Sequence, residues 1–277
     1  YNNLSVILFA FLSLFYLTVE GNQVQSLPEN ISIENQYLKV GLKKGPNYFV
    51  NSFFDKTSNQ NLLSAIYIWY QGKSYKEDKF YATWHEQNWD LVEIQNEKNK
   101  ILVKSENIDF LLLKEIVVDD ILPVWKIKYT LTAKNNFSPR LNVFPLIDLS
   151  SIFKKVYLLE DDFKKYDFKE IKKINVSKEN ICVFENESSN VSLAVILNNS
   201  VSTFSNYLSH FSIEDVGWCK RINVIHDYDG WEKYLKKGEK VETEIYFFLL
   251  NNPDKNIWKN EIESLITKLN LKSNEQK

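Results

Sequence analysis

The greatest concentration of chemically active side chains lies in one short segment that contains Trp84, His85, Glu86, Asn88 and Trp89. Indole rings stack on the apolar faces of pyranose sugars, while carboxylate, amide and imidazole groups hydrogen-bond the sugar hydroxyls. The segment therefore predicts a sugar-binding site. The same residues are also compatible with a loop whose tryptophans cover a sheet edge and whose histidine lies at the surface.

A second segment combines an imidazole, two carboxylates and an indole in His226, Asp227, Asp229 and Trp231. Asp227 and Trp231 are candidate sugar contacts, and His226 is a candidate proton donor or acceptor. The Asp-x-Asp-Gly order is similar to the start of a calcium-binding loop, but the remaining oxygen ligands are missing, so no metal site is predicted. A solvated turn explains these residues equally well.

Other kinds of chemistry find little support in the sequence. It has no Gly-x-Ser-x-Gly elbow and no His-x-x-x-His pair, and no activating motif flanks Cys182 or Cys219. The two cysteines are compatible with one disulfide or with two buried thiols. The 7 glycines are scattered, so we expect no phosphate-binding loop and no cofactor. Lys and Arg total 34 against 36 Asp and Glu, and this net charge of −2 argues against nucleic acid as a partner.

The N-terminal residues differ from the rest of the chain. Residues 4–19 form an uncharged apolar run that a polar stretch follows. Such a run predicts either a secretory signal that ends at Gly21 or an uncleaved membrane tether, and a buried core helix is the remaining alternative. The expected location is therefore extracytoplasmic. Six Asn-x-Ser sequons after the apolar run agree weakly with export, at Asn30, Asn136, Asn175, Asn186, Asn190 and Asn198.

Most of the chain alternates short β-branched and aromatic runs with turn residues. In residues 124–132, Trp125, Ile127, Tyr129 and Leu131 alternate with lysines, as expected of a strand with one face in water. Similar runs lie at residues 31–35, 37–42, 65–70, 91–94, 101–104, 110–118, 141–147, 191–197, 222–225 and 241–250. So many strands without intervening helices predict an all-β fold of two large antiparallel sheets.

Two segments depart from this strand pattern. Residues 153–173 carry several charged pairs and are expected to form an excursion or a short helix. A C-terminal helix is expected after Asn252, which can cap it, with Pro253 in the first turn. Its apolar stripe is Ile257, Trp258, Ile262, Leu265, Ile266 and Leu269. The expected organisation is a signal or anchor at 1–21, a linker at 22–30, one domain at 31–270 and a disordered tail at 271–277.

Residues 33–40 and 50–63 resemble the entry to galactose-mutarotase-like super-sandwich domains, with an Asp-Lys-Thr hairpin followed by a Leu-Leu strand. Residues 235–239, Leu-Lys-Lys-Gly-Glu, resemble the turn before the last long strand of that family, and residues 114–136 resemble its central hairpin. One departure is at residues 43–47, where the family has paired glycines in its first turn and this chain does not. The resemblance implies a two-sheet super-sandwich that handles carbohydrate.

The family suggests three functions. The leading hypothesis is an extracytoplasmic carbohydrate-binding domain without catalysis of its own. The second is an aldose 1-epimerase or related sugar-active enzyme. Its candidate catalytic residues are His85, His226 and Glu244, the last because the family has a catalytic carboxylate near the end of the chain. Glu242 and Glu244 share one face of their strand, however, and a solvent-facing surface explains this equally well. The third is a membrane-tethered envelope domain, because a similar sandwich forms the periplasmic part of bacterial insertases.

Overall fold

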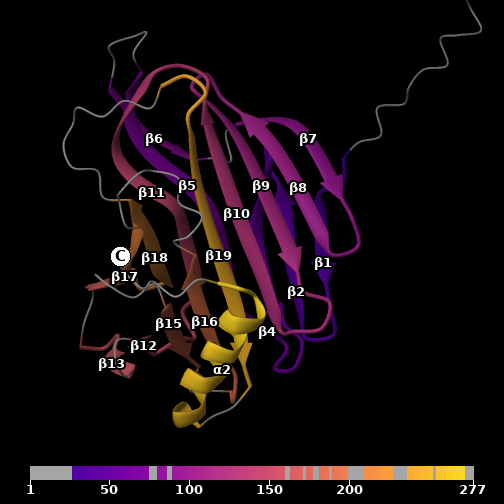
Figure 1. Cartoon of the computed structure of the whole chain (residues 1–277), viewed down its shortest axis with the longest axis vertical. Helices are drawn as coiled ribbons and strands as arrows, with labels where there is room; N and C mark the ends of the chain where they lie inside the picture. Colours follow the sequence, from indigo (N-terminus) through magenta and orange to yellow (C-terminus); the bar gives the residue numbers. More distant parts are fainter. Residues whose placement is uncertain are drawn as a thin grey trace, which may run out of the picture.

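Two antiparallel sheets face each other and enclose the core of the protein (Figure 1). The computed structural model describes residues 27–74, 80–85, 89–159, 163–170, 173–176, 181–186, 189–198, 209–226, 236–251 and 254–271. Within these ranges the structure is all-β apart from one C-terminal helix, which confirms the predicted fold class. The predicted N-terminal apolar helix, signal or tether lies outside the described residues. No helix in the described ranges has the length and apolar character of a membrane span.

The first sheet contains ten of the described strands. Its main path, in spatial order, is β1 (Asn30–Glu34), β2 (Leu38–Lys44), β3 (Tyr48–Asp55), β5 (Leu63–Ser74), β11 (Phe137–Ser150), β18 (Cys219–His226), β17 (Ser209–Asp215) and β14 (Lys173–Val176). Two further strands leave this path, β4 (Gln60–Asn61) on β3 and β6 (Phe80–His85) on β5.

The second sheet contains nine of the described strands. Their spatial order is β13 (Phe163–Asp167), β12 (Lys155–Leu159), β15 (Ile181–Glu185), β16 (Ser192–Leu197), β19 (Lys240–Leu250), β10 (Val124–Ala133), β9 (Phe110–Val118), β8 (Lys100–Glu106) and β7 (Asp90–Asn96). β19 lies at the centre of this sheet between β16 and β10, so the last strand of the chain completes it.

Side-chain alternation sets the inner and outer face of each sheet. On β10 the predicted alternation is confirmed, because Trp125, Ile127, Tyr129 and Leu131 are buried in the core between the sheets. Trp125 stacks on Phe247 of β19, with ring centroids 4.2 Å apart. The outer face of each sheet therefore holds the side chains that remain for other contacts.

The C-terminal helix α2 (Lys255–Lys268) packs on the outer face of the second sheet (Figure 1). Trp258, Ile262 and Leu265 are buried against the sheet, as predicted. The predicted stripe is wrong at Ile257, which is 38% exposed. The side chain of Asp254 caps the helix by accepting a hydrogen bond from the Asn256 N–H at 3.0 Å, so the cap lies two residues after Asn252.

Residues 153–159, 163–170 and 173, the described parts of this segment, form strands and turns and not the expected excursion or helix. They contain the antiparallel pair β12 and β13, and β13 lies at the edge of the second sheet. Its lysines made the segment look polar, and charged side chains are common on edge strands because they discourage pairing with another chain.

Both cysteines are buried free thiols, Cys182 in the second sheet and Cys219 in the first. The sequon residues differ in exposure: Asn30 is exposed, whereas Asn186 and Asn198 are buried.

Candidate functional site

A polar network occupies the outer face of the first sheet, on strands β5, β11 and β18. Ile66 on β5, Ile147 on β11 and Ile222 on β18 belong to the core between the sheets. Because side chains alternate along a strand, their neighbours Tyr67, Asp148 and Arg221 lie on the opposite, outer face. Asp148 pairs with Arg221 across the β11–β18 ladder, so the fold brings together residues that are 73 positions apart.

Asp148 and Arg221 form a two-point ion pair. Nε of Arg221 donates to Oδ1 of Asp148 at 2.7 Å, and Nη2 donates to Oδ2 at 3.0 Å. The side chain of Asp148 is only 1% exposed, while that of Arg221 is 21% exposed. The planar guanidinium fits a carboxylate at two points, and this geometry is stronger and more specific than a single contact.

Two neutral groups complete the surroundings of this carboxylate. The Tyr67 hydroxyl donates to Oδ2 of Asp148 at 3.3 Å, and the Cys219 thiol also hydrogen-bonds it. Burial, followed by the negative charge of Asp148, raises the pKa of Tyr67 to about 12 and that of Cys219 to about 12. Both groups therefore stay protonated and act as hydrogen-bond donors at neutral pH.

An exposed indole adjoins this network. Trp218, in the turn between β17 and β18, is 60% exposed, and the Arg221 guanidinium carbon lies 5.8 Å from the centre of its ring. The turn is held by Asp215, which accepts hydrogen bonds from the Gly217 N–H at 2.9 Å and from Lys220 Nζ at 2.7 Å. Gly217 has φ +93°, a conformation that favours glycine. Trp218 is therefore presented on a fixed turn.

Further polar side chains extend this outer face towards β17. Asn223 Nδ2 donates to Glu214 Oε1 at 3.2 Å, and Glu214 is the register partner of Arg221. An exposed ring, a paired guanidinium and these amide and carboxylate groups are the types of side chain that bind sugars.

Backbone register places the three histidines on or beside one row of the first sheet, with His85 about 19 Å from His210 across four strand spacings. His85 on β6 pairs with Trp69 on β5, and Trp69 pairs with Val143 on β11. Val143 in turn pairs with Ile225 on β18, the strand in which His226 follows. His210 on β17 pairs with Ile225, so residues from distant parts of the sequence share one cross-strand row.

The other predicted sugar contacts are distributed differently. Trp84 lies next to His85 on β6, whereas Glu86, Asn88, Asp227 and Trp231 lie outside the described residues. Trp89 is 1% exposed in the core, and its ring stacks on that of Phe110, with centroids 6.5 Å apart. This burial leaves no face of Trp89 for a sugar, and Trp89 has no part in the proposal below.

Glu244 lies on the other sheet, on the outer face of β19. Its Oε1 accepts hydrogen bonds from Asn198 Nδ2 and from the Tyr246 hydroxyl, both at 2.8 Å, and its Oε2 is 3.0 Å from Lys126 Nζ. Burial alone would raise the pKa of Glu244, but these three donors outweigh it and lower the pKa below its ordinary value. Glu244 is thus held as a carboxylate.

This network predicts a pH-dependent stability. Because the pKa of Glu244 is lower in the folded protein than in the unfolded chain, its contribution is present above the ordinary pKa of 4.5 and is lost as the pH falls through the folded value. Glu244→Gln should therefore cost about 2 kcal/mol of unfolding free energy at pH 7, and much less near pH 3. Urea unfolding at both pH values measures the difference.

Glu242→Gln is the matched control, because Glu242 is on the same strand and face but is more exposed, with its Lys128 contact at 3.0 Å. Its effect should stay below about 1 kcal/mol. Equal costs for the two variants at both pH values would contradict the role given to the Glu244 network.

Sequence reasoning missed Asp148, Arg221 and Trp218. One signal was present: Arg140 and Arg221 are the two arginines among the 34 basic residues. In a chain that otherwise uses lysine, an arginine indicates a position that needs a planar, two-point donor.

The comparisons with known proteins concern the fold. No family model matches the sequence, and no curated protein matches it. Among solved structures, a galactose mutarotase-like protein from Lactobacillus casei has a TM-score of 0.52 and 10% sequence identity, covering 80% of this chain and 100% of that one. A putative aldose 1-epimerase from Escherichia coli K12 has a TM-score of 0.50 and 9% identity, covering 80% and 98%.

A larger protein contains a region with a similar fold. A GH36 α-galactosidase from Geobacillus stearothermophilus has a TM-score of 0.56 and 7% identity, covering 81% of this chain but only 41% of that one. At such low identity these likenesses establish the architecture. With its two facing antiparallel sheets, this chain has the galactose-mutarotase-like super-sandwich fold.

Proposed function

We propose that this protein is a carbohydrate-binding super-sandwich domain without catalysis of its own, and that it binds sugar on the outer face of the first sheet. The observation that carries the proposal is the exposed Trp218, held on a fixed turn beside the Asp148–Arg221 pair. An exposed tryptophan beside hydrogen-bonding groups offers a stacking surface for the ring and partners for its hydroxyls. The fold and its sugar-related structural neighbours support the same class of ligand.

The charges on this face favour neutral sugars. The Arg221 guanidinium makes two hydrogen bonds to the Asp148 carboxylate, so the two charges neutralise each other. Glu214, the register partner of Arg221, adds a further acidic group. Sugar hydroxyl groups can donate hydrogen bonds to the Glu214 carboxylate. A uronic acid would instead bring a second negative charge close to that carboxylate. We therefore expect neutral oligosaccharides to bind more tightly than acidic ones.

The proposal also places the protein outside the cytoplasm. The apolar run at residues 4–19 supports export or tethering, and extracellular sugar polymers are a ligand that such a domain would meet. Mass spectrometry of the mature N-terminus in the producing cell tests this part separately, and an intact N-terminus in the cytosolic fraction would contradict it.

Trp218→Ala should weaken binding of a neutral oligosaccharide about tenfold, because it removes the stacking surface. Stachyose is a suitable first probe, since a variant of the Geobacillus α-galactosidase was solved in complex with it. Isothermal titration calorimetry measures the affinity for each member of a panel that also includes glucose-based, pentose-based and uronic oligosaccharides.

Val216→Ala is the matched control, because Val216 lies in the same turn and is 37% exposed. This variant should bind as the parent does. No binding to any member of the panel, or equal affinity for both variants and the parent, would overturn the proposal.

Sugar isomerisation is the second candidate function. The pairing of β17 with β18 favours this alternative, because it places two acid–base residues, His210 and His226, at adjacent register positions on neighbouring strands. Polarimetry on freshly dissolved aldoses distinguishes the two functions. Accelerated mutarotation that His210→Ala or His226→Ala abolishes would replace the binding proposal with the enzymatic one.

A further inference from the structure

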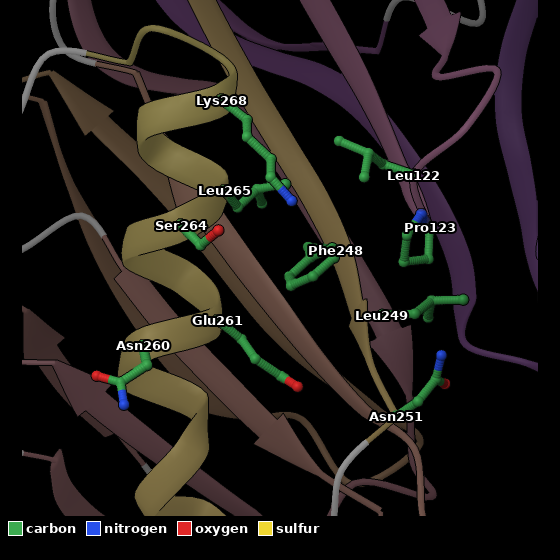
Figure 2. Close-up of a pocket in the computed structure, with 10 residues that line it drawn as sticks. All are labelled: Leu122, Pro123, Phe248, Leu249, Asn251, Asn260, Glu261, Ser264, Leu265 and Lys268. Atoms are coloured by element: carbon green, nitrogen blue, oxygen red, sulfur yellow. The ribbon is translucent and has the colours of Figure 1, made fainter.

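A pocket lies between helix α2 and the outer face of the second sheet, away from the sugar site proposed above (Figure 2). It has a volume of about 360 Å³, within the range of about 300–1,000 Å³ that is usual for small-molecule sites. Phe248 and Leu249 of β19, Leu122 and Pro123 of the turn before β10, and Leu265 of α2 supply its apolar surface.

The turn that forms one wall is fixed by several hydrogen bonds. Oδ1 of Asp119 accepts from the Leu122 N–H at 2.8 Å, and Nδ2 of Asn35, from another strand connection, donates to the Leu122 carbonyl at 2.9 Å. The Leu249 N–H donates to the Pro123 carbonyl at 3.0 Å, which ties the same turn to β19. This wall is therefore preformed.

The helix that forms the opposite wall is held at both ends. Near its start, Lys255 Nζ contacts Glu185 Oε1 at 2.9 Å and the Tyr157 hydroxyl at 2.5 Å. At its end, Leu265 and Leu271 are buried in the apolar cluster that the helix shares with the second sheet. Because both walls are fixed, a ligand would lose little free energy in ordering the protein.

Glu261 gives the pocket its chemical character. It is the part-buried member of the polar lining, and the other polar residues of the lining are exposed. No hydrogen-bond or ion-pair partner for its carboxylate occurs in the described part of the chain. Burial raises the pKa of Glu261. Figure 2 shows the side chains of Glu261 and Lys268 extending from the helix on the side of Phe248.

We propose that this pocket binds a small amphipathic molecule that carries a primary amine on an apolar body. The apolar part would contact Phe248, Leu265 and the Leu122–Pro123 wall, and the ammonium group would pair with the carboxylate of Glu261. A neutral hydroxyl can donate to the same carboxylate but without the charge, and an anion would be repelled by it. The order of affinity is thus amine, then alcohol, then carboxylate.

Ligand-observed NMR titrations with phenethylamine, 2-phenylethanol and phenylacetate test this order on the full chain. Glu261→Gln should weaken phenethylamine binding about tenfold and change 2-phenylethanol binding much less, because it removes a charge and keeps the size of the side chain. Lys268→Gln should strengthen phenethylamine binding, since it removes a like charge.

Two further variants make the test specific to the pocket. Glu263→Gln removes a charge from an exposed position of the same helix outside the pocket lining and should leave all three affinities unchanged. Ser264→Trp, at an exposed lining position, should fill the pocket and abolish binding while the thermal midpoint stays near that of the parent. Equal affinity for the three probes, equal losses in Glu261→Gln and Glu263→Gln, or unaltered binding in Ser264→Trp would overturn the proposal. Sugar binding at the first sheet is independent of each of these outcomes.

Discussion

Arg221→Met should lower the free energy of unfolding by about 3 kcal/mol, because it leaves the Asp148 carboxylate buried without its counter-charge. Asp148 is 1% exposed, so water cannot replace the two hydrogen bonds that the guanidinium donates. Methionine keeps an apolar stem of similar length, so the loss reports mainly on the charge. Guanidinium chloride unfolding at pH 7 measures the change through its midpoint and slope.

The double variant Asp148→Asn with Arg221→Met separates a stranded charge from lost packing. It should recover a large part of the stability, since the amide costs far less to bury than the carboxylate. Lys128→Met, which breaks the half-exposed contact with Glu242, should cost less than about 1 kcal/mol. A loss in the double variant as large as that in Arg221→Met alone would show that packing, and not the stranded charge, is the cause.

Trp258→Ala should destabilise the protein by about 4 kcal/mol, because it opens a cavity between helix α2 and the second sheet. The indole is 1% exposed and meets the Tyr157 ring edge-on, with centroids 5.3 Å apart. It also contacts the Phe163 ring, with centroids 6.1 Å apart. Denaturant unfolding followed by circular dichroism gives the change in free energy.

Two matched substitutions frame this result. Ile257→Ala, one residue earlier but 38% exposed, and Trp218→Ala, at a tryptophan that is 60% exposed, should each change stability by less than about 0.5 kcal/mol. A loss of unfolding free energy below about 1 kcal/mol in Trp258→Ala would mean that the packing of helix α2 contributes little to the stability of the fold.

Local patterns predicted many of the strands and the helix, because those patterns depend on neighbouring residues, but they did not predict β12, β13, β15 or β17. The alternation of Trp125, Ile127, Tyr129 and Leu131 needs one face in the core, and the structure places it there. The spacing of Trp258, Ile262 and Leu265 likewise requires one buried helix face.

The network on the first sheet could not be predicted in this way. Asp148 and Arg221 meet only because β11 and β18 pair in one register, and β11 shifts its register between Val143 and Leu146. A shift of one residue moves every following side chain to the opposite face of a strand, so the outer face of β11 depends on an irregularity that no short motif reveals.

The burial of Asn198 has a consequence for production of the protein in a host that attaches N-linked glycans. The amide nitrogen that would carry the glycan donates to Glu244 at 2.8 Å, and Asn198 is only 9% exposed, so a glycan has no room there while the native β19 contacts are in place. Replacing Ser200 by alanine would remove the acceptor sequence and leave the amide intact. The Ser200→Ala protein from such cells would then make the same Asn198–Glu244 contact as the protein from bacteria.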